Sequence, residues 1–162
     1  MTVQTQIAAE DLVLREDLGP VARLTLNLPG RINPLSEAML TRLQAGRRWT
    51  WIEGNHDPGP VELGGSHRNV LTTGPLTFRH IAEPGAVGEV SGHYHPKAQV
   101  KTRLRRISRP AFLVDGCRVI LPAFGTFTGG LRSCSAELSG LMQPDALAIL
   151  TGSCAHAVPM PR

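Results

Sequence analysis

The sequence WIEGNHD at residues 51–57 is the stretch that decides the fold. The apolar residues Trp51 and Ile52 are typical of a strand, and the polar run Gly-Asn-His-Asp follows them directly. Gly54 permits a sharp turn, so the polar side chains would project beyond the end of the strand. Open α/β sheets build their sites at this edge. The stretch therefore predicts a polar site at the end of a strand.

Two later stretches place histidines at strand ends in the same way. The sequence GHYHP at residues 92–96 follows a strand-like run, and LTFRH at residues 76–80 ends in His80. His93 and His95 are two residues apart, and such residues point the same way on an extended chain. They could therefore face one metal centre.

Side chains of this kind suit a transition metal. Imidazole nitrogen binds zinc, manganese or iron, and the side-chain oxygen of asparagine is a harder partner ligand. A single histidine at a strand end is more often a turn residue that donates to a backbone carbonyl. His67 and His156 lack the context of a motif and are predicted to be surface histidines. The three stretches together favour a metal site with these candidate ligands: Asn55, His80, His93 and His95.

The composition suits one compact domain, or one domain and a fragment. The chain has 162 residues, of which 41% are hydrophobic, and its 17 glycines and 13 prolines predict many loops. It has no apolar run of the roughly 18 residues that a membrane helix needs and no secretory leader, so we expect a cytoplasmic protein. The net charge of +4 permits contact with phosphates without demanding it. Three widely spaced cysteines predict reduced thiols.

The hydrophobic pattern predicts mainly short strands in the later part of the chain. Strands are expected over residues 49–53, 76–80, 87–91, 98–107, 111–114 and 118–122. The dipeptide Asp-Gly at residues 115–116 predicts a hairpin turn. In the early part we expect a polar tail, a strand over residues 21–27, and a helix over residues 37–44 that Ser36 caps. A further short helix is expected over residues 145–150.

Three blocks of sequence, in order, resemble the second half of the calcineurin-like metallophosphoesterases. The blocks are WTWIEGNHDP at residues 49–58, SGHYHP at residues 91–96 and LPAFGTFTGGL at residues 121–131. From about residue 42 to residue 162, the chain resembles the branch of ligase-associated DNA damage response endonucleases. The resemblance implies an α/β fold that forms part of a β-sandwich, with a mixed sheet flanked by helices and the first half of the domain missing.

The resemblance also implies roles for individual residues. Members of that family use two metals that bind a phosphate and generate a hydroxide nucleophile. One divalent metal (manganese, zinc or iron) would be held by Asn55, His80 and His93. His95 would bind the second metal, His56 would stabilise or protonate the leaving group, and Asp57 would orient His56. The loop at residues 122–130 would pack under the site.

The two motifs that open the family signature, Asp-x-His and Gly-Asp-x-x-Asp, are absent from this chain. They supply ligands to one metal and the carboxylate that bridges both. The remaining ligands are neutral, and two divalent cations a few ångströms apart repel strongly without a bridging carboxylate. We therefore expect an incomplete dinuclear site with at most one weakly held metal, which could still activate water.

The first part of the chain, about residues 12–43, resembles the opening of an enoyl-CoA hydratase (crotonase) domain. The resemblance rests on VARLTLNLPGRINPLS at residues 21–36, with Pro34 where alanine is usual. The chain has no counterpart of that family's oxyanion-hole donors or catalytic acids, and a generic strand–turn–helix is the alternative. We expect a crotonase-like segment at residues 1–45 and a metallophosphoesterase-like half-domain at residues 46–162.

A basic stretch follows the second histidine motif. Residues 97–109 contain six cations and no acid. Along an extended strand, Lys101, Arg103 and Arg105 would fall on one face. That face is either a stripe that contacts phosphates or nucleic acid or an ordinary solvated strand face. No aromatic residues interleave with the charges, so base stacking on single strands has little support.

Three functions follow from these patterns. The first is metal-dependent hydrolysis of phosphodiesters, with nucleic acid and DNA repair as context, and it requires a replacement for the missing carboxylates. The second is a non-catalytic remnant that binds one metal or a phosphate. The third is an acyl-CoA protein related to enoyl-CoA hydratases. A half-domain also exposes an apolar sheet edge or face, which predicts a homo-oligomer, and no membrane partner is expected.

Overall fold

The computed structural model describes residues 8–28, 30, 35–55, 64–101, 103, 105–125 and 128–161. The chain divides into two compact units. The first unit comprises Met1–Trp51 and Gly59–His67, and the second unit comprises Ile52–Pro58 and Arg68–Arg162. Each unit has its own cluster of buried apolar side chains.

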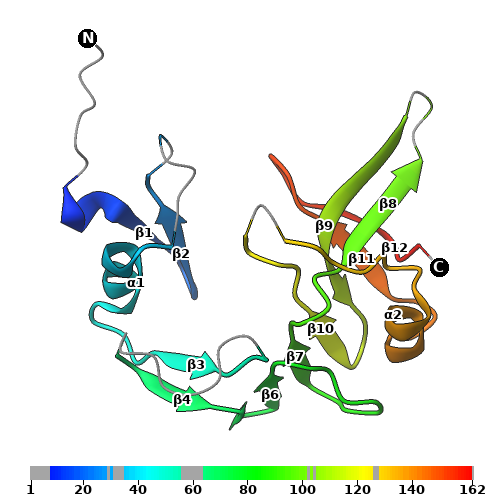
Figure 1. Cartoon of the computed structure of the whole chain (residues 1–162), viewed down its shortest axis with the longest axis horizontal. Coiled ribbons are helices and arrows are strands. Elements are labelled where there is room, and N and C mark those ends of the chain that lie inside the picture. Colours follow the sequence, from blue (N-terminus) through cyan, green and yellow to red (C-terminus); the bar gives the residue numbers. More distant parts are fainter. Residues whose placement is uncertain are drawn as a thin grey trace. The chain divides into compact units, whose positions relative to one another are not determined.

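The first unit combines a β-hairpin with one α-helix (Figure 1). Its elements are the 3-10 helix η1 (Ala9–Leu12), the strands β1 (Val13–Leu18) and β2 (Val21–Leu26), and the helix α1 (Glu37–Gln44). β1 and β2 pair in antiparallel fashion. Met39 of α1 is fully buried and clusters with Leu12 and Val13, so the helix and the hairpin share a small core.

Two of the elements expected in the first unit are confirmed, and one is new. The helix over residues 37–44 begins after Ser36, whose Oγ accepts a hydrogen bond from Met39 N (3.3 Å). The strand expected over residues 21–27 is β2. The expected polar tail is wrong in part, because β1 lies within it. All but the first residue of β1 are exposed, so its sequence lacks the alternation of a half-buried strand.

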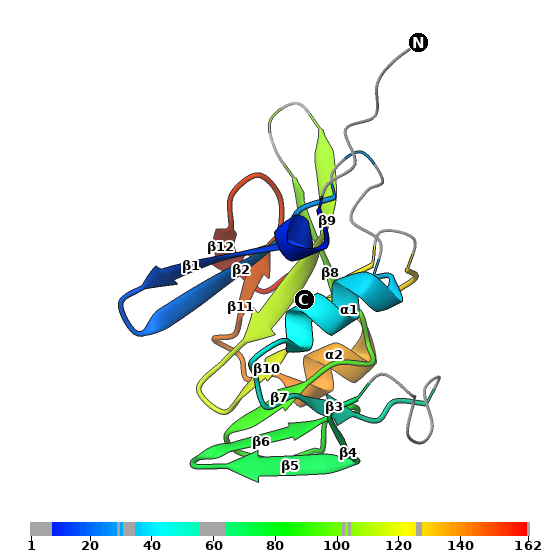
Figure 2. The same cartoon turned by 90° about the vertical axis from the view of Figure 1, so that its left-hand side faces the viewer.

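In the described part of the second unit, eight strands form one mixed sheet (Figure 1, Figure 2). The strand order is β12-β11-β9-β10-β7-β6-β5, and β8 pairs with β9 outside this path. The elements are β5 (Val70–Thr73), β6 (Leu76–Arg79), β7 (Glu89–Ser91), β8 (Lys97–Lys101), β9 (Arg106–Val114), β10 (Arg118–Ile120), α2 (Ala136–Leu141), β11 (Leu147–Leu150) and β12 (His156–Pro159). β6, β7 and β10 run parallel to one another, and the other pairs are antiparallel. The second unit is thus mostly mixed β-sheet with few helices.

The core of the second unit joins α2 to the middle of the sheet. Leu138 of α2, Leu113 of β9 and Ile120 of β10 have no exposed surface and belong to one cluster. Ala148 of β11 is equally buried in that cluster. The helix therefore covers the sheet at its central strands. A separate two-stranded sheet pairs β3 (Thr50–Ile52) with β4 (Ser66–Arg68).

The hairpin turn expected at residues 115–116 is confirmed. β9 and β10 pair in antiparallel fashion on either side of it. Asp115 Oδ1 accepts hydrogen bonds from the backbone N–H groups of Cys117 (2.7 Å) and Arg118 (2.9 Å). This local bonding is the usual reason for aspartate in turns.

The single strand expected over residues 98–107 is wrong, because two separate strands occupy this range. The chain reverses between β8, which ends at Lys101, and β9, which begins at Arg106 and runs on through residues 111–114. The apolar residues change phase at this point: Ala98 and Val100 have even numbers, whereas Ile107 and Leu113 have odd numbers. A single strand keeps one phase, so the phase change was the available sign of a turn.

The helix expected over residues 145–150 is also wrong. These residues include β11, which lies between β9 and β12. Ala148 and Leu150 point into the core, and a short apolar run fits a buried strand as well as a buried helix. The helix of this region is instead α2, which begins after Ser135, whose Oγ accepts a hydrogen bond from Leu138 N (3.4 Å).

Two further predictions from the sequence concern the cysteines and membrane-spanning helices. Cys117, Cys134 and Cys154 are all free, as predicted. Among the helices in the described ranges, none has the length and apolar character that crossing a bilayer requires.

Candidate metal centre

The candidate site lies at the carboxyl ends of the parallel strands β6, β7 and β10. His80 directly follows β6, and His93 lies two residues beyond the end of β7. Backbone hydrogen bonds join these segments, because Gly92 N donates to His80 O (3.0 Å) and Leu121 N donates to Ser91 O (2.7 Å). Open sheets bind ligands at this edge, as the sequence predicted.

Three side-chain atoms converge at this edge, and we call them the donor triangle: Asn55 Oδ1, His80 Nε2 and His93 Nδ1. The oxygen of Asn55 lies 2.7 Å from His80 Nε2 and 3.3 Å from His93 Nδ1. The two ring nitrogens are 3.0 Å apart, and the rings meet edge to face with their centroids 4.9 Å apart. The structure therefore brings together three of the four predicted ligands.

Hydrogen bonds alone cannot satisfy all three contacts of the donor triangle. The asparagine oxygen only accepts, and each ring nitrogen of a neutral imidazole either donates or accepts. If both nitrogens donate to the oxygen, their N–H groups oppose each other. If either nitrogen is unprotonated, its lone pair faces the lone pairs of the oxygen. At least one contact is unfavourable in every arrangement of protons.

The donor triangle has the dimensions of one side of a metal coordination shell. Metal–nitrogen bonds of about 2.0–2.1 Å place neighbouring ligand atoms roughly 3 Å apart, and the observed separations are 2.7 to 3.3 Å. A cation would face three lone pairs at once, which removes the conflict between the protons. The residues present thus fit one divalent metal with three neutral ligands.

Gly54 lets the ring of His80 approach the backbone. A Cβ atom at Gly54 would lie 3.0 Å from His80 Cε1 and 3.1 Å from His80 Nδ1. Real Cβ atoms rarely come so close to other atoms, so any other residue would push the imidazole away. The glycine before Asn55 is therefore needed for the position of the ring, whereas its backbone, which lacks a positive φ, does not require glycine.

His93 and His95 do not lie on an extended chain. The expectation that they point the same way because they are two residues apart on a strand is therefore wrong. Both have left-handed backbones, with φ of 63° and 47°, which are uncommon for residues other than glycine. His95 does not form a cluster with His80 and His93: within the described residues, no three His, Cys, Asp or Glu side chains gather in a way that could hold a metal ion. The role of His95 as a ligand to a second metal stays a prediction.

The loop at residues 121–131 packs against the segment that carries these histidines. Leu131 N donates to Tyr94 O (3.0 Å). A Cβ atom at Gly130 would lie 2.1 Å from His95 O, and Gly130 has a φ of 145°. Only glycine fits this close approach. Gly130 and Leu131 thus contact the segment that carries these histidines, and the packing of residues 122–130 under the metal site stays a prediction.

A hollow of about 420 Å³ opens beside the donor triangle. It is lined by Glu53, Gly54, Asn55, Asn69, Val70, Arg79, His80 and Ile81. Glu53 and Arg79 line this hollow beside two members of the triangle, and the guanidinium of Arg79 pairs with the carboxylates of Glu83 and Glu89. Neither residue was predicted from the sequence. Their positions next to Gly54 and His80 in the chain were the only signal.

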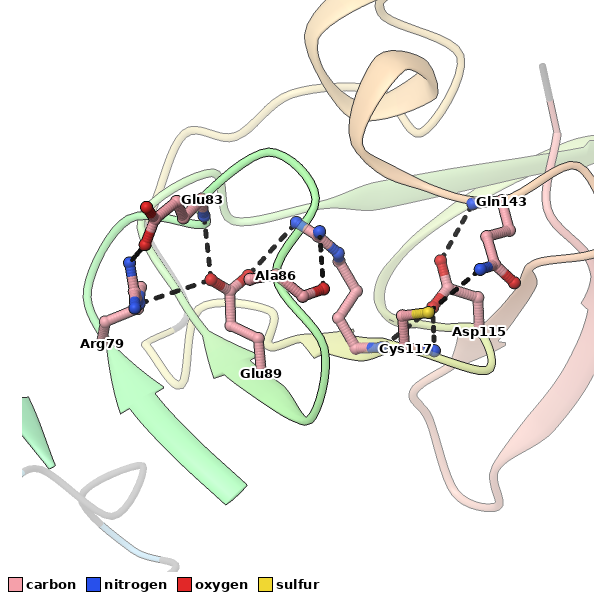
Figure 3. A network of polar contacts seen from close by, with 8 residues as sticks. Arg79, Glu83, Ala86, Glu89, Asp115, Cys117 and Gln143 are labelled. Carbon is pink, nitrogen blue, oxygen red and sulfur yellow. Dashed lines mark hydrogen bonds and ion pairs between the residues drawn. The ribbon is translucent and has the colours of Figure 1, made fainter. Parts of the chain in front are cut away.

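A buried ion pair ties the strands together near the site (Figure 3). Glu89 begins β7, and its side chain has no exposed surface. Its Oε1 lies 3.2 Å from Nη1 of Arg118 at the start of β10, and its Oε2 lies 3.4 Å from Nε of Arg79. Glu89 Oε2 also accepts a hydrogen bond from Glu83 N (2.8 Å). The carboxylate thereby links β6, β7 and β10 with the loop that follows His80.

Burial raises the pKa of two side chains in this region, Glu89 and Tyr94. Burial raises the pKa of Glu89, and the opposing attractions of Arg118 and then Arg79 offset only part of that rise. Burial, followed by the negative charge of Glu89, raises the pKa of Tyr94, against a smaller opposing effect of Arg118. The ring of Tyr94 packs edge to face on His93, with centroids 5.2 Å apart. Tyr94 is therefore a neutral packing partner of the triangle.

The other predicted site residues have different placements. His56 and Asp57 lie outside the described residues. Lys101 ends β8, and Arg103 and Arg105 follow it in the turn between β8 and β9. All three are exposed. The expectation that they share one face of a continuous strand is wrong, because the strand ends at Lys101.

The two histidines predicted to lie on the surface differ from each other. His67 is half-buried and stacks on Trp51, with ring centroids 6.3 Å apart. His156 is exposed, as predicted, and its Nε2 lies 3.4 Å from Cys154 Sγ.

No family model matches the chain, and no curated protein matches it. Among solved structures, the chain is similar to nuclease MPE of Pseudomonas putida, with a TM-score of 0.52 and 26% sequence identity. The similarity covers 76% of this chain and 58% of the nuclease chain. The fold is thus compatible with part of such a nuclease, and the chain spans 58% of its length. The resemblance of residues 12–43 to a crotonase opening receives no support.

Proposed function

We propose that the chain is a metal-dependent phosphoesterase that hydrolyses phosphodiesters, with nucleic acid as the substrate class. The convergence of Asn55 Oδ1, His80 Nε2 and His93 Nδ1 at the ends of parallel strands carries this proposal. The similarity to a nuclease supports the same class of reaction. So does the order of the sequence motifs, which resembles that of metallophosphoesterases.

In this proposal, the donor triangle holds one divalent cation: manganese, zinc or iron. A bound cation of this kind polarises a phosphoryl oxygen and lowers the pKa of bound water. The hollow of about 420 Å³ has room for a phosphodiester group. His56 would protonate the leaving group, and Asp57 would orient His56.

A second metal also needs negative charge among the ligands, because the donor triangle is neutral and two divalent cations repel each other. Glu53 is the carboxylate on the wall of the hollow, and we propose it as a partial substitute for the missing aspartates. His95 would contribute to the second metal, as the resemblance to metallophosphoesterases implies. Without such a substitute the second candidate holds: a non-catalytic protein that binds one metal or a phosphate. That the described residues contain no cluster of three His, Cys, Asp or Glu favours this alternative.

The first experiment measures metal content and turnover on the full chain. The protein is purified from medium supplemented with manganese and zinc, and its metals are quantified by mass spectrometry. Hydrolysis of bis(p-nitrophenyl) phosphate is then followed with added manganese. The variants His80→Ala and His93→Ala each remove one atom of the donor triangle. The matched control is His156→Ala, which removes an exposed imidazole of β12.

The outcomes separate the two candidates. Tightly bound metal and turnover that both disappear in His80→Ala and His93→Ala, but persist in His156→Ala, support the enzyme. One weakly bound metal without turnover supports the binding protein. Metal content that is the same in all four proteins contradicts the assignment of the donor triangle.

A further inference from the structure

β8 and β9 form an arm that extends beyond the body of the sheet (Figure 1). Within the described residues, the first half of β9, from Arg106 to Pro110, has β8 as its strand partner. The second half, from Ala111 to Val114, pairs with β11, and its last two residues also pair with β10. We call residues 97–110 the cationic arm. A lone pair of strands is marginally stable in water, so the outer half of this arm has little support from the fold.

The register of the arm brings cations together. Lys101 lies directly opposite Arg106, and Lys97 lies opposite Pro110 on the same face. Arg103 and Arg105 lie in the turn at the tip. Because like charges directly opposite each other destabilise a β-ladder, the pair Lys101–Arg106 weakens the arm just where its strands are least supported.

The arm contains no acid that could neutralise this charge. The nearest acids along the chain are Glu89 and Asp115. Glu89 is buried against Arg118, and Asp115 is occupied by backbone N–H groups of its turn. In the described part of the chain, Lys101, Arg103 and Arg106 take part in no ion pair. Concentrated, unneutralised cations on an exposed element point to an anionic partner.

The arm begins just after the segment that carries His93 and His95. Lys97 is two residues beyond His95, and its Nζ donates a hydrogen bond to Thr128 O (3.0 Å) in the loop that packs against the histidine segment. Lys101 lies four positions after Lys97 along the strand, which is a span of about 13 Å. One strand of a nucleic-acid duplex presents a phosphate roughly every 3.4 Å along the axis, so the arm can face several phosphates in a row.

We propose that the cationic arm binds the phosphate backbone of a duplex nucleic acid and holds it beside the metal centre. This inference rests on the proposed function and specifies duplex nucleic acid as the partner of the protein. Residues 97–110 contain no aromatic side chain, so the arm lacks the stacking platforms with which proteins bind unpaired bases. Contact with the backbone alone carries little sequence preference.

The test compares two variants that change net charge equally. Lys101→Gln with Arg106→Gln removes the opposed pair of the arm. The control, Arg15→Gln with Arg23→Gln, removes two exposed arginines of the first unit that are paired with Asp17 and Glu16. Binding of a fluorescent DNA duplex is measured by anisotropy in EDTA, with salt varied from about 50 to 200 mM. EDTA keeps binding separate from hydrolysis.

We expect the arm variant to bind the duplex roughly tenfold more weakly than the wild type. The slope of log affinity against log salt should fall by about 1.8, because two phosphate contacts are lost. The control should keep the wild-type slope. Equal losses of affinity in both variants would show that only net charge matters, and this would overturn the proposal. A wild type that does not bind the duplex at about 50 mM salt would also overturn it.

Two further comparisons identify the partner and separate the two proposals. Tighter binding of anionic lipid vesicles, or of the single strand, than of the duplex would overturn the choice of a duplex. A chain that binds the duplex through its arm but does not hydrolyse bis(p-nitrophenyl) phosphate with manganese would keep this inference and lose the proposed function. A chain that hydrolyses the small diester, while the arm variant binds the duplex as the wild type does, would keep the function and lose the inference.

Discussion

Glu89 shows how a single side chain links the parallel strands whose carboxyl ends carry the candidate site (Figure 3). Its carboxylate is fully buried and contacts Arg118 and Arg79, and it accepts a hydrogen bond from Glu83 N. Water would solvate the charged form better than the protein does, so burial raises the pKa of Glu89 despite the two arginines. Stability near the site should therefore depend on pH.

The first prediction concerns that dependence. The folded chain holds the proton on Glu89 more tightly than the unfolded chain, whose pKa is near 4.5. The contribution of Glu89 to stability is therefore fully present below pH 4.5 and is lost as pH rises through the raised folded pKa. Urea unfolding of the wild type and of Glu89→Gln, compared across this range, should show the wild type losing its relative advantage as pH rises.

Glu137 provides the control with the opposite sign. The N–H of its own backbone and then the side chain of Ser135 lower the pKa of Glu137. Its small contribution to stability should therefore be present above pH 4.5 and fade as pH falls. A relative stability of the wild type over Glu89→Gln that instead grows with pH would show that the arginines outweigh the effect of burial.

The second prediction concerns two neighbouring glycines. A Cβ atom at Gly130 would lie 2.1 Å from His95 O, whereas one at Gly129 would meet nothing within 4 Å. Gly130→Ala should cost about 1–3 kcal/mol of unfolding free energy, because its backbone conformation strains other residues, and should weaken metal binding. Gly129→Ala should change neither by much. Thermal unfolding and metal titration check this, and equal behaviour of the two variants would refute the close approach.

At the scale of elements, the third prediction concerns the turn between β9 and β10. Asp115 accepts hydrogen bonds from three backbone N–H groups: Cys117, Arg118 and, through Oδ2, Gln143 (2.9 Å). Asp115 thus joins the hairpin to the segment after α2. Asp115→Ala should lower the free energy of unfolding by about 1–3 kcal/mol, because two partly buried donors and one exposed donor lose their acceptor.

Asp145→Ala is the matched control for that turn. Asp145 is exposed in the next turn along the chain, so its removal should change the free energy of unfolding by no more than about 0.5 kcal/mol. Urea unfolding of both variants measures the difference. Equal small effects would mean that solvent replaces the side chain of Asp115 at no cost.

Elements with local signals could be predicted from the sequence, and elements defined by distant partners could not. The helix at residues 37–44 and the turn at residues 115–116 carry their own capping and turn residues. By contrast, β11 is a strand only because β9 and β12 flank it. The only sign of the reversal between β8 and β9 in the sequence is that the apolar residues change from even-numbered to odd-numbered positions.

The same division holds for the candidate site in the whole molecule. Asn55, His80 and His93 could be proposed because each belongs to a recognisable motif at the end of a strand, and the structure brings them together. Glu89 and Arg79 could not, because their importance comes from burial between strands that are far apart in the sequence. Polar groups at strand ends are visible in a sequence, whereas the network that positions them is a property of the packed sheet.

The last prediction follows from the presence of two separate cores. Met39 is fully buried in the core of the first unit, and Leu113 is fully buried in the core of the second. Each substitution to alanine should cost about 2–5 kcal/mol in its own unit. Hydrogen exchange should therefore speed up in α1 and the β1–β2 hairpin for Met39→Ala, and in β9, β10 and β11 for Leu113→Ala. If either variant speeds exchange equally in both units, the chain unfolds as one cooperative body, and the metal centre depends on the first unit for its stability. If exchange changes only locally, the second unit holds the donor triangle by itself.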